Sequence, residues 1–132
     1  MLIERLLNQG NGPLAAQVMR FAAARHKLLA ENIANVSTPG YRNKDLDVAG
    51  FQQMLRDRVQ LRRESPPGTV GFDDIWTETI DRGGLLFHDR NNRSIEQLVT
   101  DSAKNALLHN LVVEILRKQF GSIESALRER IG

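Results

Sequence analysis

The chain has 132 residues, of which 41% are hydrophobic and 26% charged, with ten glycines, four prolines and no cysteine. This length and ordinary apolar share fit one domain, and the lack of cysteine excludes a disulfide framework, a thiolate zinc site and a cysteine nucleophile. The net charge is only +2, because 18 Lys and Arg nearly balance 16 Asp and Glu, and this balance argues against an electrostatic nucleic-acid surface.

The first nine residues form a short amphipathic stretch rather than a signal peptide. Glu4 and Arg5 lie inside the stretch, and no small-residue cleavage site follows it, so we expect no cleaved leader. No apolar run in the chain approaches the ~20 residues of a bilayer span. The apolar members of the stretch are Leu2, Ile3, Leu6 and Leu7.

A long helix is predicted after residues 10–12, where Pro13 suits the first helical position because its missing N–H costs nothing there. At about 100° per residue, its apolar residues form two neighbouring stripes. The first stripe contains Leu14, Val18, Phe21 and Leu28. The second contains Ala15, Met19, Ala22, Leu29 and Ile33, and the polar face contains Gln17, Arg20, Lys27 and Glu31. The apolar arc covers about half of the helix, which is more than one partner helix requires.

The C-terminal segment, residues 94–132, predicts a second long helix. Ser94 to Gln97 has the pattern of a capping box, and a series of residues spaced alternately by four and three follows, as in a seam between helices that cross at shallow angles. The seam residues are Ile95, Val99, Ser102, Ala106, His109, Val113, Leu116, Phe120, Ile123 and Leu127. Further apolar residues lie off this seam, namely Leu107, Leu108, Leu111, Val112 and Ile115. Gly121 disfavours the helix by about 1 kcal/mol relative to Ala, and we expect the helix to continue through it.

The middle of the chain predicts one short helix and little else that is regular. Phe51, Met54, Leu55 and Val59 fit a helix that ends at residues 65–68, and no convincing strand pair emerges. We therefore predict a mainly α fold in which the long N- and C-terminal helices pair as an antiparallel, coiled-coil-like hairpin. The expected segments are 1–41, with the first long helix, 42–93, with the short helix and loops, and 94–132, with the last helix.

Nothing in the sequence predicts an enzyme, a metal site or a bound cofactor. The three histidines, His26, His88 and His109, are far apart, and helix packing is the better interpretation of His26 and His109. Asp73 and Asp74 fit a solvated loop, because adjacent side chains in a turn point apart. A cluster of arginines fits a solvated helix face, and its members are Arg56, Arg58, Arg62 and Arg63.

The most specific part of the sequence is residues 32–41. Asn32 and Asn35 are poor helix-interior residues that can hydrogen-bond to backbone groups in a last helical turn. Pro39 disfavours helical geometry at the residue before it, and Pro39-Gly40 predicts a type II turn with Gly40 at positive φ. A plain helix stop needs one Asn or Gly, whereas six of these ten positions are polar or conformationally special.

This stretch closely resembles the N-terminal signature of the bacterial flagellar rod and hook proteins. The matching residues are Asn32, Ile33, Ala34, Asn35, Val36, Ser37, Thr38, Pro39, Gly40 and Tyr41. Residues 41–48 with the helix after them, and residues 89–92 before the last helix, look like one short member of the family from the proximal rod. The related rod protein FlgC is the nearest alternative.

The resemblance implies a structural subunit of the flagellar basal body. Such subunits are exported by the flagellar type III apparatus without a cleaved signal, and they polymerise helically into the rod in the periplasmic space. Their terminal helices pair and form the inner wall of the tube. The implied partners are further copies of the chain, other rod subunits, the adaptor FliE and the membrane ring at the base.

Both ends of the chain are expected to make helix-pairing and subunit contacts. We expect the first stripe of the N-terminal helix to face the C-terminal helix and the second to meet a neighbouring subunit, and the reverse assignment is equally open. The contact residues are Leu14, Val18, Phe21, Leu28, Ala22, Leu29, Ile33, Val99, Ala106, Val113, Leu116, Phe120, Ile123 and Leu127. Two other readings are a stand-alone helical adaptor that binds a partner helix and a nucleic-acid binder that uses the arginines of residues 56–63; the even charge balance weighs against the second.

Overall fold

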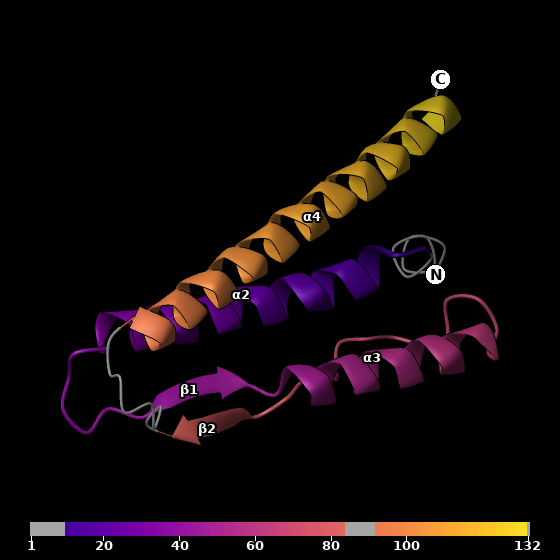
Figure 1. Ribbon diagram of the computed structural model, residues 1–132. Coiled ribbons are helices and arrows are strands. Elements are labelled where there is room, and N and C mark those ends of the chain that lie inside the picture. The colour runs from indigo at the N-terminus through magenta and orange to yellow at the C-terminus, as the bar shows by residue number, and fades with distance from the viewer. Residues whose placement is uncertain (1–9, 84–91, 132) are drawn as a thin grey trace.

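The computed structural model describes residues 10–83 and 92–131. It contains three helices and two short strands, in the order α2, β1, α3, β2, α4 (Figure 1). The elements are α2 (Gly12–Ala34), β1 (Asn43–Leu46), α3 (Val48–Arg63), β2 (Thr79–Gly83) and α4 (Asn92–Ile131). The predicted mainly helical architecture, with long terminal helices packed against each other, is confirmed.

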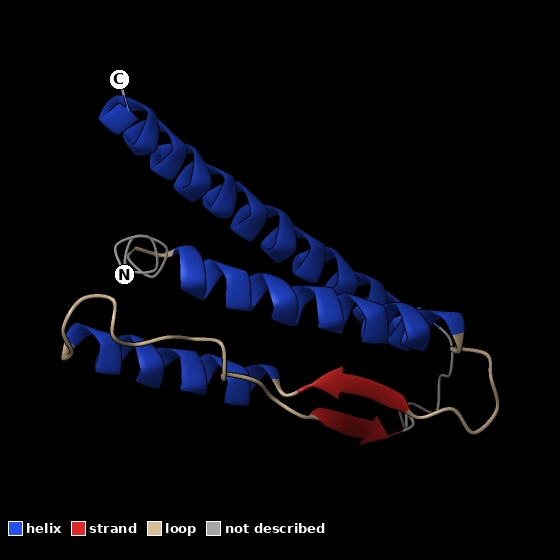
Figure 2. Ribbon diagram, turned by 180° about the vertical axis from the view of Figure 1, so that it is seen from behind, coloured by secondary structure: helices blue, strands red, loops and turns tan. Residues whose placement is uncertain are grey.

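Helix α2 is the middle layer of the molecule. Helix α4 crosses one side of it, while α3 and the two strands lie along the other side in both views (Figures 1 and 2). Pro13 occupies the first turn of α2, as predicted. The central helix is therefore covered from two directions by parts of its own chain.

Helices α2 and α4 run antiparallel. Asn105 of α4 donates a hydrogen bond from Nδ2 to the carbonyl oxygen of Ala22 at 2.7 Å. Ala15, which comes before Ala22 in α2, packs with Val112 and Leu116, which come after Asn105 in α4. Asn105 is only 2% exposed, so a polar side chain occupies the centre of this helix pair. It gives the contact between the two helices a fixed register, because a buried amide needs a partner at one position.

The seam of α4 differs from the predicted one at every second position. The buried or half-buried residues that repeat along α4 are Leu98, Ser102, Asn105, His109, Val112, Leu116, Gln119 and Ile123, and Asp101 and Val113 are half-buried as well. Ser102, His109, Leu116 and Ile123 were predicted, but the positions between them lie one residue earlier than expected. Val99, Ala106 and Phe120 are therefore exposed. The helix begins at Asn92, three residues before the start that a capping box at Ser94 would give, and it continues through Gly121 as expected.

The two stripes of α2 are covered in the opposite way to the first expectation. The second stripe faces α4 through Ala15 and Met19, whereas the first stripe packs on the middle of the chain, apart from Val18, which packs on both sides. Phe21 stacks on Phe51 of α3, with ring centroids 4.0 Å apart and planes 10° from parallel. The other buried members of this core are Leu46, Phe72 and Ile75, and Leu14, Val18 and Leu28 pack at its edge.

The middle of the chain is more ordered than predicted. Strands β1 and β2 pair antiparallel, with Leu46 opposite Thr79 and Asp45 opposite Ile80, so the expectation of no strand pair is wrong. The predicted short helix is confirmed as α3. Its N-terminus is capped by Asp47, whose side chain accepts a hydrogen bond from the backbone N–H of Gly50 at 3.0 Å.

Candidate functional site: the signature corner and the open faces of α4

The signature corner, residues 32–41, joins the end of α2 to β1. Asn32 is 1% exposed, and its side-chain amide pairs with both backbone groups of Lys44. Nδ2 donates to the Lys44 carbonyl oxygen at 2.7 Å, and Oδ1 accepts from the Lys44 N–H at 3.0 Å. The Tyr41 hydroxyl also donates to this Oδ1, at 3.3 Å. Asn32 thus fixes the direction in which the chain leaves α2.

The turn after α2 is built by the remaining signature residues. Asn35 donates from Nδ2 to the Glu31 carbonyl at 2.8 Å and accepts from the Thr38 hydroxyl at 3.2 Å. The N–H of Tyr41 donates to the carbonyl of Thr38 at 3.3 Å, and Gly40 has a φ of 74°. This geometry agrees with the predicted type II turn and explains the glycine, since a positive φ strains L residues that carry a Cβ.

A buried ion pair lies directly beyond the corner. The carboxylate of Asp45, 1% exposed, accepts from Arg25 of α2 through Nε at 2.9 Å and through Nη2 at 3.1 Å. Arg82 of β2 reaches the same carboxylate at 3.3 Å, with 47% of its side chain exposed. The three charges tie α2 to both strands. This connection was not foreseen from the sequence, where Asp45 resembles an ordinary strand-edge residue.

Among the described residues, an extended apolar surface lies open on α4. Leu107 is 70% exposed and Leu111 59% exposed, and Leu108 and Ile115 continue the same face. We call these four residues the outer leucine face. Adjacent exposed apolar side chains over about two helical turns are unusual on an isolated subunit and are typical of a surface that another protein covers. A second exposed edge of α4 contains Ile95, Val99 and Ala106.

A groove runs between α2 and α3, with a volume of about 440 Å³. Its apolar lining comes from both helices, and its rim carries Arg56 and Arg63. The groove residues are Leu14, Val18, Leu55, Arg56, Val59, Gln60 and Arg63.

The predicted solvated arginine face is only partly correct, because two of its four members bind other parts of the chain. Arg58 donates to Asp74 at 2.6 and 2.8 Å, an ion pair that lowers the pKa of the Asp74 carboxyl and raises that of Arg58. Arg62 donates to the carbonyl of Gly10 and lies over the ring of Phe72 at 5.7 Å. Asp74 is exposed, as predicted for its loop.

The predicted contact residues divide into covered and open positions. Ala22 and Leu29 are 0% and 1% exposed, so they belong to the interior of this chain and are not available to a neighbour. Those that stay accessible are Val99, Ala106, Phe120 and Leu127, while Ile33, Val113 and Ile123 are half-buried. The sequence interpretation passed over the outer leucine face as a site, although its residues had been noted as lying off the seam.

Two polar residues were assigned to the wrong environment. Gln17 is buried, and its Nε2 donates to the carbonyl of Ile75, so it is not part of the polar face of α2. His26 is exposed, so it does not pack within a stripe, whereas His109 is half-buried in the seam. His88 lies outside the described residues.

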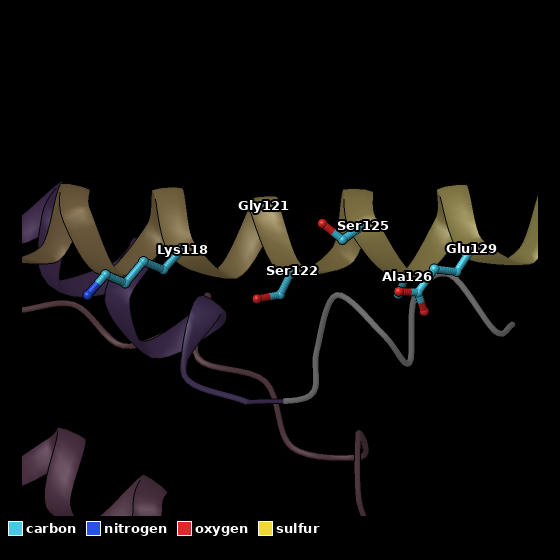
Figure 3. Close-up of a pocket in the computed structure, with 6 residues that line it drawn as sticks. All are labelled: Lys118, Gly121, Ser122, Ser125, Ala126 and Glu129. Carbon is cyan, nitrogen blue, oxygen red and sulfur yellow. The ribbon is translucent and has the colours of Figure 1, made fainter.

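Two kinds of site were searched for in the described part of the chain, a metal site and a membrane-spanning helix. Across residues 10–83 and 92–131, no group of three or more His, Asp or Glu side chains is placed to hold a metal ion. None of the helices in those ranges combines the length and the apolar content needed to cross a bilayer. A further hollow along α4, lined by Lys118, Ser122 and Glu129 among others, is open to solvent (Figure 3).

Comparison with known proteins found relatives of one kind. No family model matches the chain. It is 25% identical over 118 residues to the flagellar basal body rod protein FlgB of Aquifex aeolicus, and the alignment covers 89% of this chain and 92% of the relative. It is 27% identical over 112 residues to the flagellar basal body rod protein FlgB of Bacillus subtilis, and this alignment covers 80% of this chain and 84% of the relative.

Proposed function

We propose that this chain, whose recognition as a FlgB-family protein is supported by relatives aligned over most of its length, is a structural subunit of the flagellar basal body rod. Those relatives are named as rod proteins and not as enzymes. Within the rod, we assign the chain to the proximal part, with the FlgC position as the alternative.

The observation that carries the proposal is the outer leucine face. Leu107 and Leu111 are left exposed by α2, which packs on a neighbouring face of α4 through Val112 and Leu116. An apolar face of this kind favours association with another subunit. The groove between α2 and α3 is a second surface, different from the outer leucine face. If the outer leucine face of one copy binds the groove of the next, the contact joins unlike surfaces, and such contacts extend into a helical polymer instead of closing into a dimer.

The remaining parts of the proposal concern partners and location. In the rod, the chain contacts further copies of itself, other rod subunits, the adaptor FliE and the ring at the membrane. It is exported by the flagellar type III apparatus without a cleaved signal and works in the periplasmic space. The alternative class is a stand-alone helical adaptor, which requires a single partner helix on the outer leucine face and no self-assembly.

Gene deletion followed by complementation tests the proposal. In the bacterium that carries this chain, deletion of its gene is expected to abolish rod assembly and motility, and the wild-type chain to restore both. Leu111→Glu is expected to restore neither, because a buried carboxylate at a subunit contact is strongly unfavourable. Gln52→Glu, an exposed position on α3, is the matched control and is expected to restore motility. A deletion strain that still assembles rods would show that the chain is not a rod subunit.

Purified protein separates the rod subunit from the adaptor. Folded Leu111→Glu with wild-type helix content by circular dichroism is expected to lose concentration-dependent association in sedimentation velocity. If the wild-type chain stays monomeric at all concentrations and instead forms a one-to-one complex with a single flagellar protein, the adaptor is the correct class.

A further inference from the structure

The groove between α2 and α3 lies between two contacts that join these helices. At one end, Phe21 of α2 stacks on Phe51 of α3, with ring centroids 4.0 Å apart. At the other end, Arg62 of α3 donates a hydrogen bond to the carbonyl of Gly10, just before α2. The two helices are therefore fixed relative to each other, and the groove is formed before any partner binds.

The floor of the groove is apolar and only partly buried. Leu14 and Val18 of α2 and Leu55 and Val59 of α3 line it. All four pack on the core from its edge and are half-buried. The groove has a volume of about 440 Å³, so apolar side chains from a partner can enter it and remove this floor from water, which is favourable.

One rim of the groove is cationic. Arg56 and Arg63 of α3 form it, and both are exposed. They are seven residues apart, so they lie on one face of the helix and about 10 Å apart along its axis. Arg56 donates to Oε1 of Gln53 at 3.0 Å. Within residues 10–83 and 92–131, neither arginine forms an ion pair with a carboxylate, so both charges are available to a partner.

The carboxylates of α3 lie away from the groove. Asp57 and Glu64 follow Leu55 by two and nine residues, which places both about 180–200° around the helix from it. Each accepts a hydrogen bond from a glutamine, from Gln53 to Asp57 at 2.9 Å and from Gln60 to Glu64 at 2.7 Å. No Asp or Glu is among the described residues that line the groove, so its rim attracts negative charge.

We propose that this groove binds an amphipathic helix of a partner protein that carries acidic side chains along one edge of its apolar stripe. A groove between two packed helices suits a third helix, whose apolar side chains enter it. Carboxylates at positions i and i+7 of that helix are about 10 Å apart on one face, the same separation as Arg56 and Arg63. Guanidinium groups pair with carboxylates in a fixed geometry, so the rim selects the charge and the orientation of the partner.

A second copy of the chain fits the groove less well than such a helix. Its outer leucine face has Lys104 one turn before Leu107 and Lys118 one turn after Ile115, so an ammonium group lies at each end of that apolar surface. In the groove these groups approach the two rim arginines, and like charges weaken a contact. An acidic helix is therefore expected to bind more tightly than another copy.

Designed peptides test the groove on the purified full chain. The probe is a fluorescein-labelled, alanine-based helix of about 18 residues, with a leucine stripe and two glutamates seven positions apart beside it. The comparison peptide has lysines at those two positions. Fluorescence anisotropy is expected to show that the glutamate peptide binds at least about tenfold more tightly than the lysine peptide. Arg56→Glu with Arg63→Glu is expected to reverse this preference.

The matched control is Lys104→Glu with Lys118→Glu, which reverses two charges on α4 outside the groove. It is expected to keep the preference for the glutamate peptide, whereas a peptide bound on the outer leucine face responds to these two positions. All four substituted positions are exposed, and circular dichroism confirms that both double variants are folded.

Three results would overturn the proposal. Equal binding of the two peptides, or a preference that changes only in the control variant, would show that the rim arginines do not select the partner. Binding of oleate but not of the glutamate peptide, lost in the groove variant, would assign the groove to an anionic lipid. Self-association that is lost in the groove variant, with no peptide binding to the wild-type chain, would assign it to a second copy. These measurements do not involve rod assembly, so their outcome does not depend on whether the chain is a rod subunit.

Discussion

Asn32 on α2 hydrogen-bonds to both the N–H and the carbonyl of Lys44 on β1, at 3.0 and 2.7 Å. The side chain therefore pairs with the strand as a neighbouring strand would, although it belongs to a helix. An amide is suited to this role because it offers a donor and an acceptor side by side. The signature asparagine is a structural junction between the long helix and the ribbon, and it lies too deep for a partner protein to contact it.

Replacement of Asn32 by Asp is expected to destabilise the fold by about 2–3 kcal/mol. The carboxylate keeps the acceptor for the Lys44 N–H but loses the donor, and it sets a negative oxygen against the Lys44 carbonyl in a site that is 1% exposed. Urea denaturation followed by circular dichroism measures the change. Asn35→Asp, at a half-exposed position of the same corner, is the control, with an expected loss below about 1 kcal/mol. Equal losses at the two positions would contradict the role assigned to Asn32.

The two arginines that bind Asp45 are expected to differ in their contribution. Arg25→Met removes a bidentate partner from a carboxylate that is 1% exposed and is expected to lower the free energy of unfolding by about 2–4 kcal/mol, because it leaves a buried charge with weaker compensation. Arg82→Met removes a half-exposed, longer contact and is expected to cost less than about 1 kcal/mol. Urea midpoints of the two variants give the comparison. A larger loss for Arg82→Met would show that the strand, and not α2, holds the carboxylate.

The long helices and the signature turn could be predicted because their signals are local. Pro13, the apolar stripes and Gly40 act within a few residues of their own positions, so their periods and turn preferences are visible in the sequence. The strand pair was missed for the opposite reason. Strands β1 and β2 are four and five residues long and lie far apart in the chain, and their pairing depends on Asp45 meeting Arg25 and Arg82, which no local pattern reveals.

The seam of α4 shows why a correct pattern can still select the wrong face. The series with Val99, Ala106 and Phe120 is more apolar than the observed one, which contains Asn105 and Gln119. An interpretation based on polarity alone therefore selected the exposed series as the seam that faces α2. The side-chain N–H of the buried Asn105 is compensated by the carbonyl of Ala22, a contact with a residue 83 positions away. A helix that is apolar on several sides does not indicate which side meets its own chain and which meets a neighbour.

Two leucines of α4 are expected to respond differently to truncation. Leu116→Ala removes a side chain that is 9% exposed and packs on Ala15, so a loss of about 2–4 kcal/mol is expected. Leu111→Ala removes one that is 59% exposed, and the stability of the monomer is expected to change by less than about 0.5 kcal/mol. Both are measured by urea denaturation of dilute protein. A large loss at Leu111 would mean that this face is already covered within the single chain.

Two glycines are expected to give opposite results when replaced by Ala. Gly40 has a φ of 74° and no atom within 4 Å of a built Cβ, so the expected loss of about 1 kcal/mol is entirely backbone strain. Gly121 lies within α4 with open space around it, and Ala there is expected to favour the helix by up to about 1 kcal/mol. Urea midpoints and helix content by circular dichroism check both changes. Stabilisation by Gly40→Ala would contradict the assigned turn.

The pair of Arg58 with Asp74 is expected to make a pH-dependent contribution to stability. Hydrogen bonds from Arg58 hold the pKa of Asp74 below its ordinary value of 3.8. Because the pKa is lower in the folded than in the unfolded chain, the contribution is complete above pH 3.8 and disappears as the pH falls through the folded value. Asp74→Asn is therefore expected to lower the urea midpoint equally at pH 7 and pH 5 and to have a smaller effect near pH 3. Asp73→Asn, the adjacent exposed carboxylate, is the control, and its effect is expected to be small at every pH. An effect of Asp74→Asn that grows as the pH falls would reverse the sign and refute the ion pair as its cause.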